Sequence, residues 1–125
     1  MKYLLDTTVL ADFANGVPAA RPLVESLFSE LHDLYTCDVV TAEALSWRDP
    51  DELRYVGALL DVLEYTATSP GAARWAGQSR RERGARGGRS LGDALIAGIA
   101  WSLGATIVTR NPDDFVRQGV PVLAY

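Results

Sequence analysis

Cysteine, histidine and lysine each occur only once in the chain, as Cys37, His32 and Lys2. A single cysteine excludes an internal disulfide and a thiolate zinc site, and it is typical of proteins in a reducing compartment. A single histidine excludes a polyhistidine metal centre and leaves one candidate base for any catalytic triad. The only lysine is Lys2, so the chain also lacks the Gly-x-x-x-x-Gly-Lys loop of P-loop nucleotidases.

Leader-like segments and long apolar runs are missing as well. Met1 and Lys2 lead directly into Tyr3-Leu4-Leu5, so we expect no signal peptide. The longest apolar run, from Ala94 to Trp101, is too short to span a membrane. We therefore expect a soluble, cytoplasmic protein with no membrane partner, folded as a single domain over residues 1–125.

What the chain does contain is an acidic residue at four points where an apolar run passes into a helix start: Asp6, Glu43, Asp93 and Asp114. In an α/β fold these junctions lie at one edge of the sheet, where ligands bind. Carboxylates gathered there repel one another, and a divalent cation with oxygen ligands neutralises them. A site made only of carboxylates suits Mg²⁺ or Mn²⁺, the ions of phosphoryl chemistry.

Helix capping is the simpler explanation for each acid taken alone. The candidate caps are Asp6 itself or Thr7 or Thr8, Thr41 ahead of Glu43, Ser90 in a capping box with Asp93, and Asn111 followed by Pro112. Capping does not explain why Asp6 and Asp93 stand in such apolar surroundings. We therefore prefer the hypothesis that the four acids form one site.

Basic residues are unevenly placed, although the net charge is −4. Five arginines fall within ten residues and are interleaved with glycines: Arg80, Arg81, Arg83, Arg86 and Arg89. Arginine binds phosphate bidentately, so this segment is a candidate clamp for a nucleic-acid backbone. The alternative is a solvated helix end that continues into a loop. We favour the clamp because the segment immediately precedes Asp93.

Hydrophobic periodicity predicts alternating strands and helices. We expect strands at 2–6, 34–37, 62–67, 106–109 and 120–123, and helices near 8–14, 19–32, 41–48, 51–61, 70–83 and 90–103. Such alternation indicates an α/β protein with a parallel, doubly wound sheet.

Three motifs resemble those of the PIN-domain family, and within it those of VapC-type ribonuclease toxins. They are LLDTTVLADF with Asp6, TAEAL with Glu43, and GDALIAGIAWSLGATIVTRNPDDF with Asp93. The resemblance covers essentially the whole chain and implies a three-layer α/β/α domain with a central, mainly parallel sheet flanked by helices. Asn111 departs from the commonest pattern, which has aspartate there. That leaves the fourth acid to Asp114, with Asp113 as the substitute.

The resemblance implies a Mg²⁺- or Mn²⁺-dependent endoribonuclease. Asp6 and Asp93 would bind a first metal, Glu43 would complete the pocket, and Asp114 would hold a second metal or orient a water. Thr8 and Asn111 would support these ligands. Hydrolysis by activated water needs no ribose 2′-OH, so 5′-phosphate and 3′-OH ends are expected.

The same resemblance implies a VapB-type antitoxin, a homodimer of this chain and a larger toxin–antitoxin hetero-oligomer. We expect the antitoxin to dock on an apolar groove formed by side chains of two helical regions: Leu23, Leu27, Phe28, Leu31, Leu45, Trp47, Tyr55 and Leu59. Two other functions remain open. One is a PIN-like module that binds RNA or protein without cutting, and the other is a phosphohydrolase of small molecules.

Overall fold

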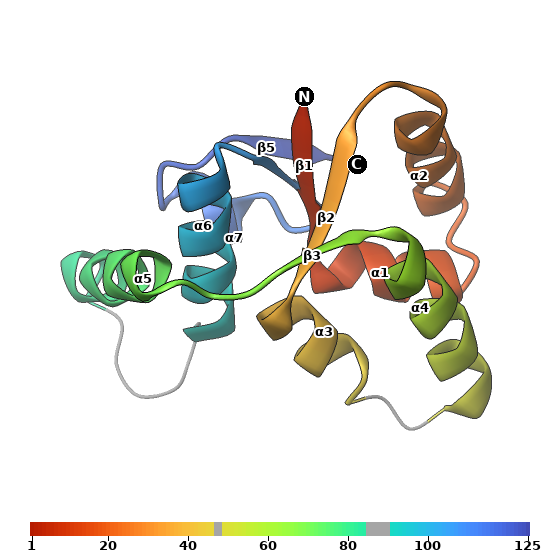
Figure 1. Cartoon of the computed structure of the whole chain (residues 1–125), viewed down its shortest axis with the longest axis horizontal. Coiled ribbons are helices and arrows are strands. Elements are labelled where there is room, and N and C mark those ends of the chain that lie inside the picture. The colour runs from red at the N-terminus through yellow and green to blue at the C-terminus, as the bar shows by residue number, and fades with distance from the viewer. Residues whose placement is uncertain (47–48, 85–90) are drawn as a thin grey trace.

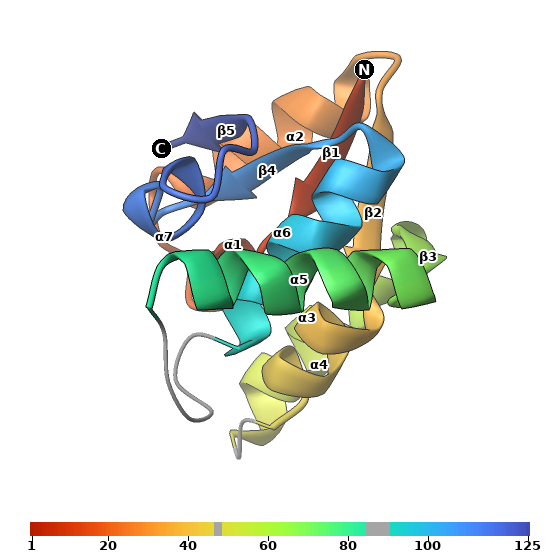
Figure 2. The same ribbon diagram turned by 90° about the vertical axis from the view of Figure 1, so that its left-hand side faces the viewer.

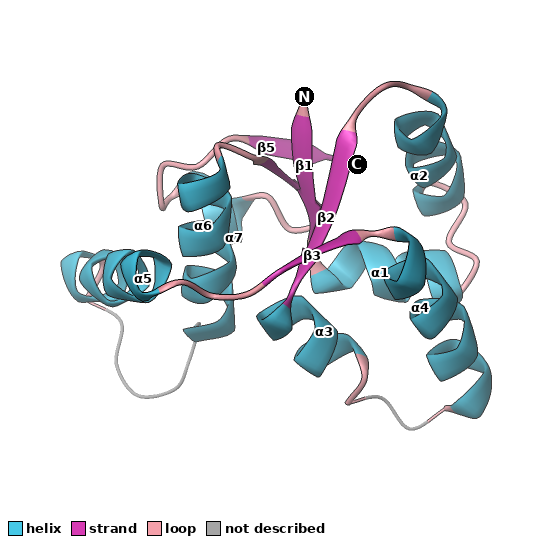
Figure 3. Cartoon of the chain, in the orientation of Figure 1, coloured by secondary structure: helices cyan, strands magenta, loops and turns pink. Residues whose placement is uncertain are grey.

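The computed structural model describes residues 1–46, 49–84 and 91–125. Its strands are β1 (Lys2–Leu5), β2 (Asp33–Cys37), β3 (Glu64–Thr66), β4 (Thr106–Thr109) and β5 (Val122–Ala124). They form one sheet in the order β3-β2-β1-β4-β5, and every neighbouring pair is parallel (Figure 3). Parallel strands need crossover connections, and the helices provide them.

Helices cover both faces of this sheet. They are α1 (Thr7–Ala14), α2 (Ala20–Ser29), α3 (Asp38–Ala44), α4 (Pro50–Val62), α5 (Pro70–Glu82), α6 (Leu91–Leu103) and α7 (Asp113–Val116). Helices α1, α2 and α4 lie on one side, α5, α6 and α7 lie on the other, and α3 lies at the edge where β1 and β2 end (Figures 1 and 2). The predicted three-layer α/β/α fold is therefore confirmed. In the described part of the chain, no helix is long and apolar enough to cross a membrane.

The core is formed by the central strands and the helices packed against them. Leu4 and Leu5 of β1 and Ile107 and Val108 of β4 are completely buried. Helix α6 is apolar around most of its circumference because it lies between the sheet and α5. At Gly98 the two helices touch through backbone, since a Cβ there would lie 2.5 Å from the carbonyl oxygen of Ala72.

Helix α3 begins three residues before the predicted start at residue 41. Cys37 is its N-cap, with extended backbone angles (φ −139°, ψ 171°), and the Cys37 Sγ accepts a hydrogen bond of 3.5 Å from the Val40 amide. Thr41 lies inside the helix, so the prediction that it caps this helix is wrong. The predicted end at residue 48 is also too late, because α3 ends at Ala44.

Other boundaries also differ from prediction, three of them by two or three residues. Helix α2 ends at Ser29 rather than residue 32, because Glu30 adopts an extended conformation (φ −97°, ψ 162°). Helix α4 runs to Val62, which shortens the strand predicted at 62–67 to Glu64–Thr66. The last strand begins at Val122 rather than residue 120.

Candidate functional site

Asp6 lies where the order of the strands in the sheet reverses. Strand β1 has β2 on one side and β4 on the other, and in doubly wound sheets the crevice at such a switch point binds ligands. Asp6 directly follows β1 and precedes α1, and its amide donates to the Val108 carbonyl of β4 at 3.0 Å. This bond fixes Asp6 at the carboxyl edge of the sheet.

Hydroxyl groups hold the Asp6 carboxylate in place. Thr8 Oγ1 and Thr109 Oγ1 donate to Asp6 Oδ2 at 3.1 and 2.9 Å. Asp6 occupies the N-cap position of α1, but its side chain forms no capping hydrogen bond. Burial raises its pKa above the ordinary 3.8, and the hydrogen bonds from Thr109 and Thr8 oppose that rise. Asp6 is thus a buried carboxyl group, with only 4% of the residue exposed, and its side chain does not cap α1.

Thr109 is a residue of this region that the sequence analysis did not single out. It is completely buried at the end of β4, and it accepts a hydrogen bond from the Asn111 amide at 3.0 Å while donating to Asp6. Thr8 accepts one from the Arg110 amide at 3.2 Å. The feature of the sequence that could have identified Thr109 is its hydroxyl at the end of an otherwise apolar strand, at the predicted ligand-binding edge.

Glu43 reaches this edge from α3. Thr7 Oγ1 donates to Glu43 Oε1 at 2.9 Å, which ties the glutamate to the residue after Asp6. On its other side the carboxylate lies against Gly92, where a Cβ would come within 2.9 Å of Glu43 Oε2. Gly92 therefore leaves space for Glu43 beside the start of α6.

Asp93 lies in the first turn of α6 and is half-buried. Its pKa is raised from 3.8 to about 6, first by burial and then by the negative charges of Asp114, Asp6 and Glu43, in that order. The positive charge of Arg83 opposes the rise. Because each of the three acids acts on Asp93, the structure brings all four predicted acids into one electrostatic neighbourhood. Ser90, the other half of the predicted capping box, lies outside the described residues.

Asp114 comes from α7, close to the end of β4. Asp114, but not Asp113, is among the charges that raise the Asp93 pKa, which favours Asp114 as the fourth acid. Helix α7 begins at Asp113 without a side-chain cap, so the prediction that Asn111 caps it is wrong. Asn111 instead contributes backbone bonds, donating to Thr109 and accepting from the Asp114 amide at 3.4 Å.

The arginine segment is partly described. Arg80 and Arg81 occupy the last turn of α5, and Arg83 follows as its C-cap. Arg83 lies near enough to lower the Asp93 pKa, so one predicted phosphate-binding group adjoins the acids. Arg86 and Arg89 lie outside the described residues.

The donor set is made of carboxylates alone, which is the chemistry that oxygen-binding divalent cations require. Among the described residues no three histidine, cysteine or acidic side chains are grouped closely enough to hold a metal ion together. The other three acids nevertheless raise the pKa of Asp93, and Gly92 leaves room for Glu43. The residues therefore fit a divalent cation by their donor chemistry and by the negative charge around Asp93.

A second buried acid besides Asp6, Asp12, belongs to a different arrangement. Arg110 Nη1 donates to Asp12 Oδ1 at 2.8 Å, and the Tyr125 hydroxyl donates to Asp12 Oδ2 at 2.7 Å. Burial and the Asp12 charge raise the Tyr125 pKa. Asp12 is fully engaged in tying α1 to the end of β4 and to the C-terminal residue, so it is a structural charge.

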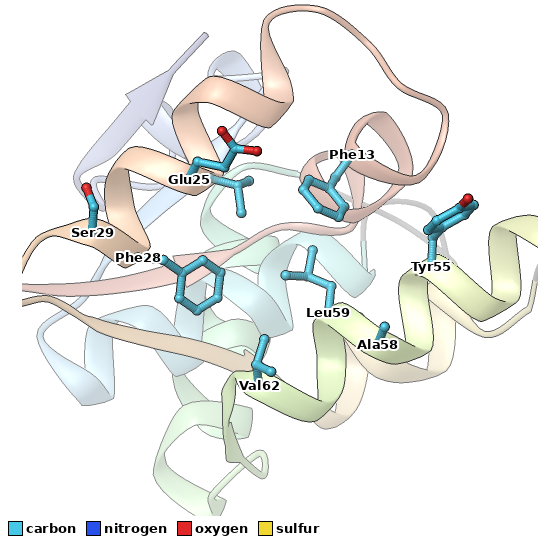
Figure 4. Close-up of a pocket in the computed structure, with 9 residues that line it drawn as sticks. Phe13, Glu25, Phe28, Ser29, Tyr55, Ala58, Leu59 and Val62 are labelled. Atoms are coloured by element: carbon cyan, nitrogen blue, oxygen red, sulfur yellow. The ribbon is translucent and has the colours of Figure 1, made fainter.

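An apolar groove of about 530 Å³ lies between α1, α2 and α4 (Figure 4). Phe13, Phe28, Leu59 and Val62 converge on it, and Glu25 and Ser29 stand on the α2 side. Of the docking residues predicted from sequence, Phe28, Tyr55 and Leu59 line the groove. Four others do not line it: Leu23, Leu27, Leu31 and Leu45. Trp47 lies outside the described residues.

Comparison with known proteins identifies the family. The model of the PIN domain matches residues 3–120. Ribonuclease VapC19 from Mycobacterium tuberculosis is 30% identical over 113 residues, which is 90% of each chain. The chain therefore belongs to the PIN-domain family, and within it to the VapC-type proteins.

Solved structures share this fold. One is a VapBC2 complex from Rickettsia felis bound to a DNA fragment from its promoter. It has a TM-score of 0.82 and 24% identity, with 100% of this chain and 99% of that chain covered. Another is a DNA-bound VapBC from Salmonella typhimurium, with a TM-score of 0.77, 25% identity, and coverage of 99% and 98%.

Proposed function

We propose that the protein is a divalent-metal-dependent endoribonuclease that acts in the cytoplasm as the toxin of a toxin–antitoxin pair. The observation that carries this proposal is the pKa of Asp93, which three other acids at the sheet edge help to raise to about 6. Likeness to a protein named as a ribonuclease gives the substrate class.

Asp6 and Asp93 are the proposed ligands of a first cation, Glu43 completes the pocket, and Asp114 binds a second cation or a water. Bound Mg²⁺ or Mn²⁺ would lower the pKa of a water molecule and offset charge on the phosphodiester. Thr8 and Thr109 fix the orientation of Asp6 through its Oδ2 atom. Arg83 adds a positive charge for the phosphate beside Asp93.

The test is cleavage of total cellular RNA by purified, partner-free protein, with Mg²⁺ or with a chelator, followed by mapping of the ends. We expect metal-dependent products with 5′-phosphate and 3′-OH ends. Asp6→Asn and Asp93→Asn should each abolish cleavage, while Asp113→Asn serves as an acid-to-amide control from the same edge. Full activity of the first two variants would refute the proposed site.

The arginines at the end of α5 are proposed to bind the RNA backbone. Replacing Arg80, Arg81 and Arg83 with alanine should weaken RNA binding and reduce the slope of log affinity against log salt by up to about 3, because fewer counterions are released. Metal affinity should hardly change. An unaltered salt slope would place the phosphate contacts elsewhere.

The apolar groove is proposed to bind a VapB-type antitoxin. Related structures are toxin–antitoxin complexes, and a groove between three helices suits an amphipathic segment. Glu25 at its edge favours a basic residue of the partner. Co-expression with the neighbouring open reading frame should yield a co-purifying complex and relieve toxicity. Harmless expression of the chain alone, with no binding neighbour, would refute the toxin role.

The chain is also proposed to form a homodimer. A second hollow, of about 570 Å³, lies between α3 and α6 beside Glu43 and is lined by Val39, Leu91 and Leu95 among others. Leu91 is 42% exposed, so this face offers apolar surface for a second copy. Each antitoxin-bound dimer would then be at least a heterotetramer.

A further inference from the structure

A third cavity differs from both apolar hollows in its chemistry. It has a volume of about 350 Å³ and is lined by Trp75, Gln78, Ser79, Glu82 and Gln118. Two carboxamides, a hydroxyl, a carboxylate and an indole therefore surround it. Groups of these types hydrogen-bond the edges of nucleobases, whereas an apolar hollow does not.

The floor of the cavity is held rigidly. Ser79 and Gln118 are each only 9% exposed, and the Ser79 hydroxyl donates to Gln118 Oε1 at 3.2 Å. Gln118 Nε2 donates in turn to the Asp114 carbonyl at 2.7 Å. These bonds connect α5 with α7 and leave one amide N–H of Gln118 and the lone pairs of Ser79 for a ligand.

The rim carries an oriented acid. Gln78 Nε2 donates to Glu82 Oε1 at 3.0 Å, which orients the exposed Glu82 carboxylate. Among the described residues, Oε2 and the second lone pair of Oε1 remain available as acceptors. Trp75 forms an aromatic wall that is itself braced by Trp101, with the two rings stacked at 5.9 Å. Bases bound by proteins commonly lie against such rings.

The position of the cavity connects it to the acidic site. Gln118 Nε2 donates to the carbonyl of Asp114, which is one of the four candidate acids. Glu82 is followed directly by Arg83, the candidate phosphate-binding residue at the end of α5. The cavity therefore adjoins residues of the proposed site on both of the segments that line it.

We propose that this cavity binds a guanine base of the RNA, on a nucleotide adjacent to the scissile phosphate. The inference rests on the proposed ribonuclease function. Guanine presents two neighbouring donors, N1–H and N2–H₂, which match the acceptor pair of the Glu82 carboxylate, and its O6 accepts from an amide N–H of Gln78 or Gln118. Adenine, cytosine and uracil do not present two adjacent donors on that edge.

One test measures the base alone, without metal or cleavage. NMR titrations of the intact protein in chelator would compare GMP, IMP and AMP, which share the phosphate and ribose. We expect GMP to bind roughly tenfold more tightly than IMP, which lacks the N2 amine, because the lost bond is to a charged group. AMP should bind no better than IMP. Glu82→Gln should remove the preference, and Glu64→Gln on β3 should retain it. Equal binding of the three nucleotides would overturn the proposal.

A second test locates the base in RNA. A random-sequence RNA is cut by the wild-type protein and by Glu82→Gln, and the ends are sequenced. We expect guanine to be enriched at one position within two nucleotides of the cut for the wild type, and the enrichment to be lost in the variant. Cleavage with no such preference overturns the proposed guanine site but is consistent with the proposed ribonuclease function. Selective GMP binding without RNA cleavage refutes the proposed ribonuclease function instead. Micromolar GMP binding without a cut-site preference identifies a free-nucleotide site and overturns the RNA assignment.

Discussion

Two threonine hydroxyls orient one oxygen of the Asp6 carboxylate, so Thr109 can be tested by removing its hydroxyl alone. Thr109→Val keeps the shape of the side chain and should lower the RNA cleavage rate by roughly 10- to 100-fold, because a hydrogen bond to a charged group contributes about 1.5–3 kcal/mol. Thr109→Ser restores the hydroxyl and should recover most of the rate. Single-turnover cleavage measures both. A wild-type rate for Thr109→Val would mean that Asp6 needs no such support.

The raised pKa of Asp93 makes stability depend on pH. Its pKa in the folded protein, about 6, exceeds the ordinary 3.8, so ionisation of Asp93 costs the folded state free energy. In chelator, the Asp93 contribution to the free energy of unfolding is therefore greatest below pH 4, falls as the pH rises through 6, and is constant above that.

Asp93→Asn should remove this loss. The wild-type side chain is half exposed, so solvent weakens the effect. We expect the free energy of unfolding at pH 7.5 to be about 1 kcal/mol higher for the variant, and its melting temperature roughly 3–6 °C higher than that of the wild type. Near pH 4 the two proteins should melt together. Thermal melts across this range measure the effect, and a variant less stable than the wild type at pH 7.5 would contradict it.

The four acids of the candidate site could be predicted from the sequence, but the individual contacts that support them could not. Asp6, Glu43, Asp93 and Asp114 stand out because each follows an apolar run at a helix start, and the topology brings such starts together. The bond from Thr109 to Asp6 joins residues 103 positions apart, and the space that Gly92 leaves for Glu43 depends on how α3 meets α6. Neither follows a local pattern.

At the level of elements, the contact between α5 and α6 depends on glycine. Gly98→Ala would place a Cβ 2.5 Å from the Ala72 carbonyl oxygen, and backbone cannot give way as a side chain can. We expect a loss of about 1–3 kcal/mol in the free energy of unfolding, measured in urea. Weaker RNA binding should accompany it, because α5 carries Arg83 towards the acids.

Gly77→Ala is the matched control, because Gly77 lies within α5 and its Cβ would meet nothing within 4 Å. This change should raise the free energy of unfolding by about 0.5–1 kcal/mol, since alanine loses less backbone entropy on folding. Destabilisation by both variants would mean that helix position, rather than the close contact, decides the outcome.

The hydrophobic periodicity predicted which segments are strands and which are helices. It did not predict several of the residues at which these elements begin or end. The alternation of apolar strands with amphipathic helices predicted the parallel sheet correctly. The start of α3 was missed because its cap is the Cys37 thiol, an uncommon capping group, and a better cap, Thr41, stands three residues later. The early end of α2 depends on the extended conformation of Glu30, which places Leu31 in solvent.

For the whole molecule, recognition of an inhibitor and catalysis should be separable. Phe28→Asp puts a charge into the groove between α1, α2 and α4, which none of the four acids lines, and should abolish antitoxin binding while RNA cleavage continues. Leu31→Asp is the control, because Leu31 is fully exposed outside that groove. Pull-down and cleavage assays on both variants measure the two functions. Undiminished binding by Phe28→Asp would place the antitoxin on another face.

The order of the strands also determines when the protein can become active during its own synthesis. The ribosome makes β1 first, but one of its two neighbours, β4, begins only at Thr106, and both Thr109 and Asp114 come later still. A nascent chain that ends before β4 holds Asp6 on an incomplete sheet, without the Thr109 hydroxyl that orients it. The proposed ribonuclease site is therefore complete only after Asp114 has left the ribosome, and a shorter nascent chain lacks part of it.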